Sequence, residues 1–267
     1  MTTAPRVTLT IVEHVAHVRL NRPEKRNGFD VAMFEALIET GERLIADRSV
    51  RAVVLAGEGK AFSAGLDWMS IMAAGAEAAE QLLSPSGSSP ANAAQRSCWV
   101  WREVPVPVIA AVHGAVLGAG LQLALAADLR IAAPDSMLGA LEVRYGLVPD
   151  MSASQVLLKL VRPDVARELL YTGRQVAADE ALRLGLVTQL ADDPVAAATS
   201  MALAIAAHSP HAVRAAKALC QGAPELSVAA ALAFEATLQK QLIGTKNQLE
   251  AARAMMARDV PIFDDPT

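Results

Sequence analysis

The sequence predicts an α/β fold in which strands and helices alternate before a largely helical last third. Short, wholly apolar segments at 52–56 and 108–112 are typical of strands that are buried on both faces. Each is followed by glycine residues and then by helical periodicity, so a strand, a glycine turn and a helix occur twice. From Ser152 onward the pattern is helical almost throughout, with one further strand expected near 186–190.

The elements before the first buried strand follow from periodicity and capping. Residues 7–10 and 15–20 are expected to pair as strands. In the second segment, Val15, His17 and Arg19 alternate with the apolar Ala16, Val18 and Leu20, which is the period of two that a strand shows. Asp30 is expected to cap a helix whose apolar positions include Met33 and Leu44. These features predict a strand hairpin followed by a helix.

The middle of the chain carries further short elements. A helix is expected over 121–127, and short strands are expected at 129–132 and 137–139. Ser84–Asn92 is rich in Ser, Pro and Gly and separates two helical stretches. It is either a surface loop or a lid over a pocket.

Composition and charge exclude several classes of protein. The chain has 267 residues and is 53% hydrophobic, which supports a substantial core and excludes global disorder. The net charge is −4 and no run of Lys or Arg occurs, so nucleic acid is not expected as a partner. Cys98 and Cys220 cannot build a disulfide framework, which favours a reducing compartment. With neither a secretory signal nor an apolar run of membrane-spanning length, we expect a cytoplasmic protein with no membrane partner.

The two glycine turns are the first candidate for chemistry. Such turns leave backbone N–H groups unpaired at a helix N-terminus, where a phosphate or an oxyanion can bind. Neither turn is a P-loop, and 118–123 (GAGLQL) has only the first two glycines of a dinucleotide fingerprint, which disfavours NAD. The residues around Ser63 do not form the Gly-x-Ser-x-Gly motif of serine hydrolases. No His pair shows metal-ligand spacing with a carboxylate, so no metal site is expected.

Two acidic residues lie in otherwise apolar surroundings. Glu142 follows residues 137–141 (MLGAL), and Asp150 follows residues 145–149 (YGLVP). Each is either a solvated loop carboxylate or part of a site. Two turns that offer N–H groups, together with two carboxylates in apolar company, suit enolate chemistry.

In their order and spacing, several segments resemble the crotonase (enoyl-CoA hydratase/isomerase) superfamily over essentially the whole chain. The matching segments are 21–27 (NRPEKRN), 57–67 (GEGKAFSAGLD), 107–120 (PVIAAVHGAVLGAG), 128–132 (DLRIA), 171–174 (YTGR) and its continuation to 187. The resemblance implies a crotonase-like spiral of repeated ββα units over residues 1–197. It also implies a C-terminal helical region at 198–267 that serves oligomerisation and covers the active site, in a homotrimer or homohexamer.

The resemblance implies roles for individual residues. The backbone N–H groups of Leu66 and Ala119 would form an oxyanion hole for the thioester carbonyl of an acyl-CoA substrate. Coenzyme A would enter as part of that substrate, and no separate cofactor is expected. The residues expected to bind it are Lys25, Arg26, Ser63, Ala64, Gly65, Asp67 and Gly118.

The acidic positions bear on the reaction. Hydratases of this family use two glutamates, and here the first position is Gln122 and the second is Glu142. Glutamine cannot take or give a proton at neutral pH. Asp150 falls where the dienoyl-CoA isomerases of the family place their proton-abstracting aspartate, and Glu142 falls on their partner glutamate, although those isomerases carry an acid at position 122 as well. Isomerisation of an enoyl- or dienoyl-CoA is therefore favoured, with hydration by Glu142 and Asp150 or non-catalytic acyl-CoA binding as alternatives.

Overall fold

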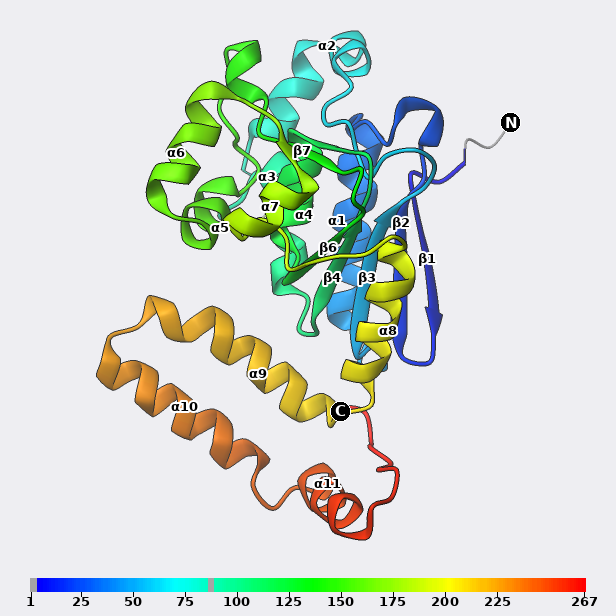
Figure 1. Ribbon diagram of the computed structural model, residues 1–267, viewed down its shortest axis with the longest axis vertical. Coiled ribbons are helices and arrows are strands. Elements are labelled where there is room, and N and C mark those ends of the chain that lie inside the picture. Colours follow the sequence, from blue (N-terminus) through cyan, green and yellow to red (C-terminus); the bar gives the residue numbers. More distant parts are fainter. Residues whose placement is uncertain (1–3, 86–88) are drawn as a thin grey trace.

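The two buried apolar segments lie side by side at the centre of the main sheet (Figure 1). The computed structural model describes residues 4–85 and 89–267. β1 runs antiparallel to β2, and every other pairing in this sheet is parallel. The strands, in their order across the sheet, are β1 (Val7–Val12), β2 (Val15–Leu20), β3 (Ala52–Gly57), β4 (Val108–Val112), β6 (Leu129–Ala132) and β9 (Gln189–Leu190).

A second, smaller sheet continues from the end of β4. Its strands are β5 (Ala115–Leu117), β7 (Met137–Gly139) and β8 (Val176–Ala177). β5 and β7 pair in parallel, and β8 pairs antiparallel to β7. β8 was not predicted, and the strand expected near 186–190 is reduced to the two residues of β9. Two-residue strands are too short for a period-2 pattern, so only their pairing partners define them.

Helices cover both faces of the main sheet. They are α1 (Val31–Ala46), α2 (Trp68–Leu83), α3 (Ala93–Glu103), α4 (Ala119–Ala126), α5 (Ala153–Leu160), α6 (Pro163–Thr172), α7 (Ala178–Leu184), α8 (Pro194–Ala206), α9 (Pro210–Gly222), α10 (Val228–Leu242) and α11 (Lys246–Ala257), with short 3-10 helices η1 (Pro23–Lys25), η2 (Glu142–Tyr145) and η3 (Ala223–Glu225). Alternate residues of β3 enter two separate cores: Val53 and Leu55 pack with α1 and α3, whereas Val54 packs with α8. This two-sided burial explains why β3 is apolar at every position.

The predicted α/β fold is confirmed, and most expected elements are present. Asp30 caps α1, with its side chain accepting the N–H of Met33. The helix expected over 121–127 begins earlier, at Ala119. All eight residues of α4 are buried, so it has no polar face from which a periodicity could mark its first turn.

The predicted loop or lid at Ser84–Asn92 lies partly outside the described residues, because 86–88 are not described. Pro85 and Asn92 form an isolated bridge, and Asn92 caps α3 in a reciprocal arrangement with Gln95. The choice between a surface loop and a lid stays a prediction.

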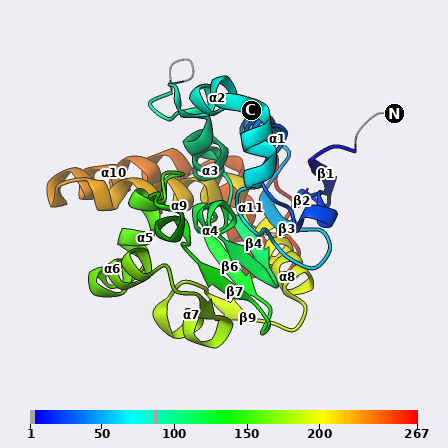
Figure 2. The same ribbon diagram turned by 90° about the horizontal axis from the view of Figure 1, so that it is seen from above.

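The C-terminal helices divide differently from the expected boundary at 197/198. Helix α8 crosses this boundary, and its residues Ala198 and Ala202 are fully buried against the sheet. The part that leaves the body begins with α9: Figures 1 and 2 show α9 and α10 as a hairpin that projects from the sheet-containing body. Lys217 of α9 anchors it, donating to the carbonyl of Val106 at 2.9 Å and to Oδ2 of Asp128 at 2.7 Å.

Among the helices of residues 4–85 and 89–267, none is long and apolar enough to cross a membrane.

Candidate active site

The two glycine turns, which follow β3 and β5, meet through main-chain contacts. The N–H of Ser63 donates to the carbonyl of Ala115 at 3.0 Å, and the carbonyl of Ser63 accepts the N–H of Leu117 at 3.0 Å. Gly65 has φ +92°, and a Cβ there would lie 2.8 Å from the carbonyl oxygen of Leu117. A Cβ at Gly120 would lie 2.6 Å from the Cβ of Ser63. Only glycine at these two positions allows the turns to approach this closely.

This approach leaves two backbone N–H groups without partners. Across the described chain, neither the N–H of Leu66 nor that of Ala119 donates a hydrogen bond, although the N–H groups of Gly65 and Asp67 on either side of Leu66 both do. Ala119 is the first residue of α4, where helical geometry supplies no acceptor. A Cβ on Gly65 would lie 3.6 Å from the nitrogen of Ala119, so the two turns present their free donors close together.

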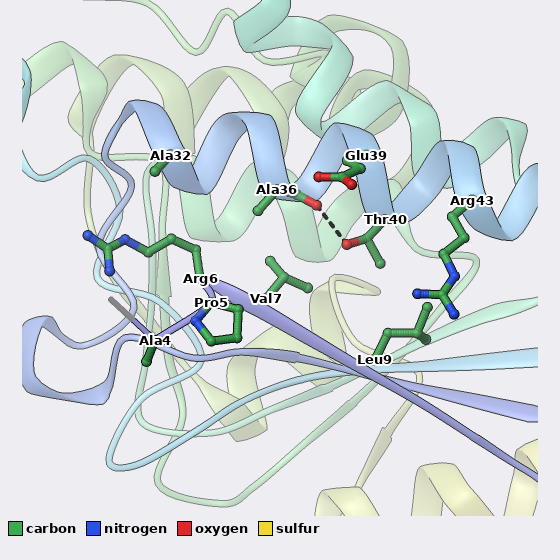
Figure 3. A pocket seen from close by; sticks show the side chains of 10 residues that line it. All are labelled: Ala4, Pro5, Arg6, Val7, Leu9, Ala32, Ala36, Glu39, Thr40 and Arg43. Atoms are coloured by element: carbon green, nitrogen blue, oxygen red, sulfur yellow. Dashed lines mark hydrogen bonds between the residues drawn. The ribbon is translucent and has the colours of Figure 1, made fainter. Parts of the chain in front are cut away.

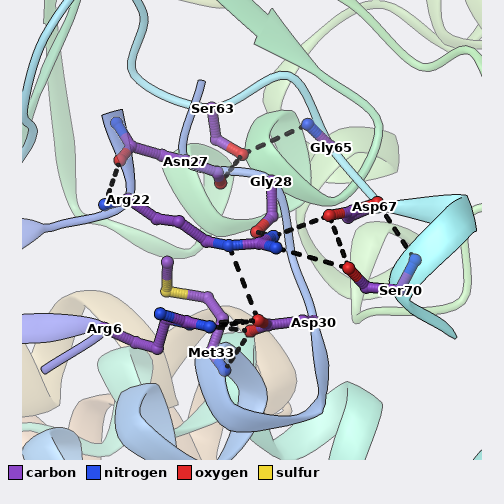
Figure 4. Close-up of polar contacts among 10 residues, drawn as sticks. All are labelled: Arg6, Arg22, Asn27, Gly28, Asp30, Met33, Ser63, Gly65, Asp67 and Ser70. Carbon is purple, nitrogen blue, oxygen red and sulfur yellow. Dashed lines mark hydrogen bonds and ion pairs between the residues drawn. The ribbon is translucent and has the colours of Figure 1, made fainter. Parts of the chain in front are cut away.

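A buried arginine holds the first turn (Figure 4). The guanidinium of Arg22 donates to the carbonyl of Gly28 at 2.9 Å and pairs with Asp67 at 2.8 Å. It also lies 3.5 Å from Asp30, so one cation joins the residues that cap α1 and α2. The Ser70 hydroxyl and Arg22 lower the pKa of Asp67 to about 2, which keeps this carboxylate charged.

Both turns open onto one apolar cavity of about 330 Å³. The turns contribute Ala64, Gly65, Leu66, Gly118 and Ala119 to its wall. Helix α2 contributes Trp68, Ile71, Leu82 and Leu83. The opposite wall is the segment from Leu141 to Met151, which carries Glu142 and Asp150, and Gln122 of α4 lies between them. The cavity wall therefore includes both predicted acidic residues and both residues whose N–H groups have no partner.

Gln122 connects the two acidic segments. Its Nε2 donates to Oε1 of Glu142 at 2.8 Å, and its Oε1 accepts the N–H of Met151, the residue after Asp150, at 2.7 Å. Oε2 of Glu142 is buried and has no partner among the described residues. Burial raises the pKa of Glu142, partly offset by the Gln122 hydrogen bond, and the nearby charge of Asp150 raises it further. Burial also raises the pKa of Asp150. The pKa values of both carboxyl groups are thus raised above those of free acids, toward neutral pH.

The structure brings most of the predicted site residues together at this cavity: Ala64, Gly65, Leu66, Gly118, Ala119, Gln122, Glu142 and Asp150. Four others lie elsewhere. Lys25 and Arg26 are exposed on and after η1, outside the cavity wall. Ser63 is fully buried, and its hydroxyl donates to the carbonyl of Asn27. The carboxylate of Asp67 is engaged by Arg22 and Ser70.

Comparisons with known proteins identify the family. Residues 10–265 match the enoyl-CoA hydratase/isomerase family. The chain belongs to this family. It is 34% identical over 260 residues to the mitochondrial Delta(3,5)-Delta(2,4)-dienoyl-CoA isomerase of Mus musculus, covering 92% of this chain and 77% of that protein. It is 33% identical over 268 residues to the (E)-benzylidenesuccinyl-CoA hydratase of Thauera aromatica, covering 96% of this chain and 98% of that protein.

The fold comparison gives the same family. The crystal structure of enoyl-CoA hydratase from Bacillus anthracis superposes with a TM-score of 0.90 at 30% identity, covering 97% of this chain and 98% of that one. The expected crotonase-like fold is therefore confirmed, and the protein is an enzyme of the enoyl-CoA hydratase/isomerase family.

Two features of this family member were not predicted from the sequence. Arg22 lies within the matched segment 21–27, but a single arginine among charged neighbours carries no sign of its burial. The rings of Trp68 and Tyr145 lie with centroids 5.6 Å apart on the cavity wall. The position of Trp68, directly after the first glycine turn, was the sequence feature that could have indicated its place on the cavity wall.

A second cavity, of about 420 Å³, lies between β1 and α1 and holds none of the predicted site residues (Figure 3). Its wall includes Arg6, Glu39 and Arg43. Arg6 is paired with Asp30 at 2.8 Å, and the Thr40 hydroxyl donates to the carbonyl of Ala36. No group of three or more His, Cys, Asp or Glu side chains within the described ranges is placed to hold a metal ion.

The contacts of Glu142 predict opposite effects of two substitutions on its pKa. Gln122→Leu removes a hydrogen bond to the charged carboxylate and should raise the pKa of Glu142 further. Asp150→Asn removes a nearby negative charge and should lower it. Carbon-13 NMR titration of protein labelled at the glutamate carboxyl carbons measures both shifts. Shifts in the same direction for both variants would contradict this electrostatic account.

Proposed function

We propose that this enzyme moves a double bond along the acyl chain of an enoyl- or dienoyl-CoA. The observation that carries the proposal is the pairing, in one apolar cavity, of two free backbone donors with two carboxylates whose pKa values are raised. Such a cavity suits a reaction in which a proton leaves one carbon and returns to another, while negative charge collects on the thioester oxygen.

The N–H groups of Leu66 and Ala119 would hold the thioester carbonyl. Both are unpaired and belong to residues that line the cavity, and Ala119 stands at the N-terminus of α4, where the helix dipole favours negative charge. Donors that are fixed in advance stabilise the dienolate without reorganising during the reaction. This oxyanion hole would make a proton of the acyl chain removable.

Glu142 and Asp150 would exchange the protons. Two neighbouring carboxyl groups in an apolar cavity do not ionise together, which yields one base and one acid. The base takes a proton from the chain, the C–H electrons shift through the conjugated system to the thioester oxygen, and the other carboxylic acid protonates a carbon farther along. Gln122 donates to Oε1 of Glu142, whereas the buried Oε2 has no partner among the described residues, so Oε2 would be the oxygen that carries the proton. No water is added in this sequence.

Coenzyme A would bind along the first glycine turn as part of the substrate, with no separate cofactor. Ala64, Gly65 and Gly118 line the cavity, and the N–H of Ala64 donates to the carbonyl of Arg26 at 2.9 Å. The exposed side chains of Lys25 and Arg26 are thereby tethered beside the turn, where they can meet the phosphates. Ser63 and Asp67 would act indirectly, by fixing the turn.

Hydration is the second candidate, favoured by the close superposition with the Bacillus anthracis enoyl-CoA hydratase. One of Glu142 and Asp150 would then take a proton from the attacking water molecule, and the other would protonate the acyl chain. A panel of enoyl- and dienoyl-CoA substrates, with products identified by NMR, separates the two reactions. Double-bond migration without water addition supports isomerisation, and 3-hydroxyacyl-CoA as the main product overturns it.

The proposed oxyanion hole predicts the effect of removing one donor. Ala119→Pro deletes an N–H at the first position of a helix, where proline is well tolerated. Turnover should fall by ~10²–10³-fold, the usual effect of losing one oxyanion donor. Ala119→Gly keeps the N–H and should stay close to the wild-type rate. A folded proline variant with full turnover, with folding checked by its thermal melt, would exclude this role.

The proposed proton transfers predict a division of work among three side chains. Glu142→Gln and Asp150→Asn should each lower kcat by ~10²–10⁴-fold while CoA-thioester binding is nearly unchanged. Gln122→Ala should lower kcat much less. Gln122→Glu should raise the rate of water addition relative to that of isomerisation. Steady-state kinetics and inhibitor titration measure these effects. If Asp150→Asn keeps wild-type rates while Glu142→Gln is inactive, a single-glutamate mechanism replaces this one.

We also propose that the chain assembles as a homotrimer or homohexamer through its C-terminal helices. None of the residues of α10, which is described throughout, is buried, and Leu232 on this helix is 59% exposed. Large exposed apolar surfaces mark interaction sites. Light scattering at micromolar concentration should give a mass of three or six chains, and Leu232→Glu should lower it. A monomeric wild-type mass rejects the proposal.

A further inference from the structure

We infer that the acyl group handled at this site is an uncharged, planar unsaturated hydrocarbon, aryl-bearing or conjugated, and that Trp68 and Tyr145 select it. The inference rests on the proposed binding of acyl-CoA thioesters in the cavity between the two glycine turns. It narrows that function to one class of acyl group.

The charge pattern of the cavity disfavours acidic acyl groups. Apart from Gln122, Glu142 and Asp150, its lining side chains are apolar or aromatic, and no Lys, Arg or His is among the described lining residues. A free carboxylate on the acyl chain would lose its contacts with water on binding and would meet two acidic side chains, with no cation to pair with it. Unpaired and like charges of this kind are the usual means by which a site rejects a ligand.

An aromatic pair joins the two walls of the cavity. Trp68 begins α2, directly after the first glycine turn, and Tyr145 ends η2, the short helix that begins with Glu142. Their rings are inclined by 36° with centroids 5.6 Å apart. Tyr145 is 60% exposed, so the pair lies at the opening of the cavity rather than in its depth.

Both rings belong to segments that also carry groups of the proposed site. Trp68 is two residues from Leu66. Tyr145 is three residues from Glu142, so the side chains of Tyr145 and Glu142 lie on the same side of η2. Aromatic side chains hold a planar π system by stacking on its face or edge, and a planar group loses little freedom when it binds. A saturated, flexible chain gains less from the same surface.

The experiment is a binding and rate comparison with four CoA thioesters: 3-phenylpropenoyl-CoA, 2,4-hexadienoyl-CoA, 2-hexenoyl-CoA and (E)-benzylidenesuccinyl-CoA. The first and last both carry a phenyl group conjugated to an alkene, and the last adds a free carboxylate. Kd from calorimetry and, for those that react, kcat/KM should favour the first two. (E)-Benzylidenesuccinyl-CoA should bind about 100-fold more weakly than 3-phenylpropenoyl-CoA, because like-charge contact is strongly unfavourable.

Matched variants assign the selection to named residues. Trp68→Leu and Tyr145→Leu should each reduce the preference for phenylpropenoyl over hexenoyl by about 3- to 10-fold, whereas Tyr145→Phe keeps the ring and the preference. Val148 lines the cavity and is 72% exposed, so Val148→Arg places a cation at its rim. Val148→Arg should strengthen binding of the acidic thioester relative to Val148→Gln.

The outcomes separate this inference from the proposed function. Selective binding of the uncharged planar thioesters, with no double-bond migration in 2-hexenoyl-CoA or 2,4-hexadienoyl-CoA, supports the inference and overturns the proposed reaction. Migration with equal affinity for acidic and uncharged acyl groups overturns the inference and leaves the reaction standing. Ring-deleting variants with an unchanged preference also overturn it, as does a wild-type enzyme that binds none of the four thioesters.

Discussion

The close approach of two glycine turns determines the geometry of the rest of the site. Ser63 donates to the carbonyl of Ala115 and accepts from the N–H of Leu117, which holds the turns together. Gly65 and Gly120 lie where any side chain would collide with the opposite turn. Because the main chains are in contact, Leu66 and Ala119, whose N–H groups have no partner among the described residues, line the same cavity. The sheet supports this arrangement, since β3 and β4 are adjacent parallel strands, and β5, which precedes the second turn, follows directly after β4. Any change that separates the turns also separates the two donors.

The electrostatics of the cavity follow from its apolar walls. Burial raises the pKa values of Glu142 and Asp150, whereas Arg22 and Ser70 keep Asp67, just behind the first turn, fully charged. Neighbouring carboxylates thus differ in their surroundings: Asp67 is paired and fixes the backbone, whereas Glu142 and Asp150 line the cavity. Gln122 links the latter two by contacting Glu142 and the main chain beside Asp150. A neutral amide does this without adding a third carboxyl group to the cavity.

The cavity belongs to the sheet-containing body of the molecule, and the last three helices lie outside it. Every cavity residue lies before α5, in the sheet-containing body, whereas α9, α10 and α11 project from it (Figure 1). Lys217 fixes the start of this projecting part to Asp128, and Arg51 pairs with Asp265 near the C-terminus at 2.8 Å. The projecting helices are thus anchored at both ends, while Val228 and Leu232 of α10 remain exposed. This exposure is the basis of the proposed assembly.

Much of the fold could be predicted from local patterns. The strands β3 and β4, the Asp30 cap and the family resemblance depend on residues close together in the chain, where apolar runs, caps and glycine spacing are directly visible. The sequence also determined that Glu142 and Asp150 lie in apolar company, and that position 122 carries no acid. Only the tertiary structure decided that Gln122 contacts Glu142, 20 residues away, that Arg22 is buried among Gly28, Asp30 and Asp67, and that Trp68 meets Tyr145 across the cavity. The physical reason is that burial and pairing between distant segments arise from the packing of whole elements, and no single segment contains that information.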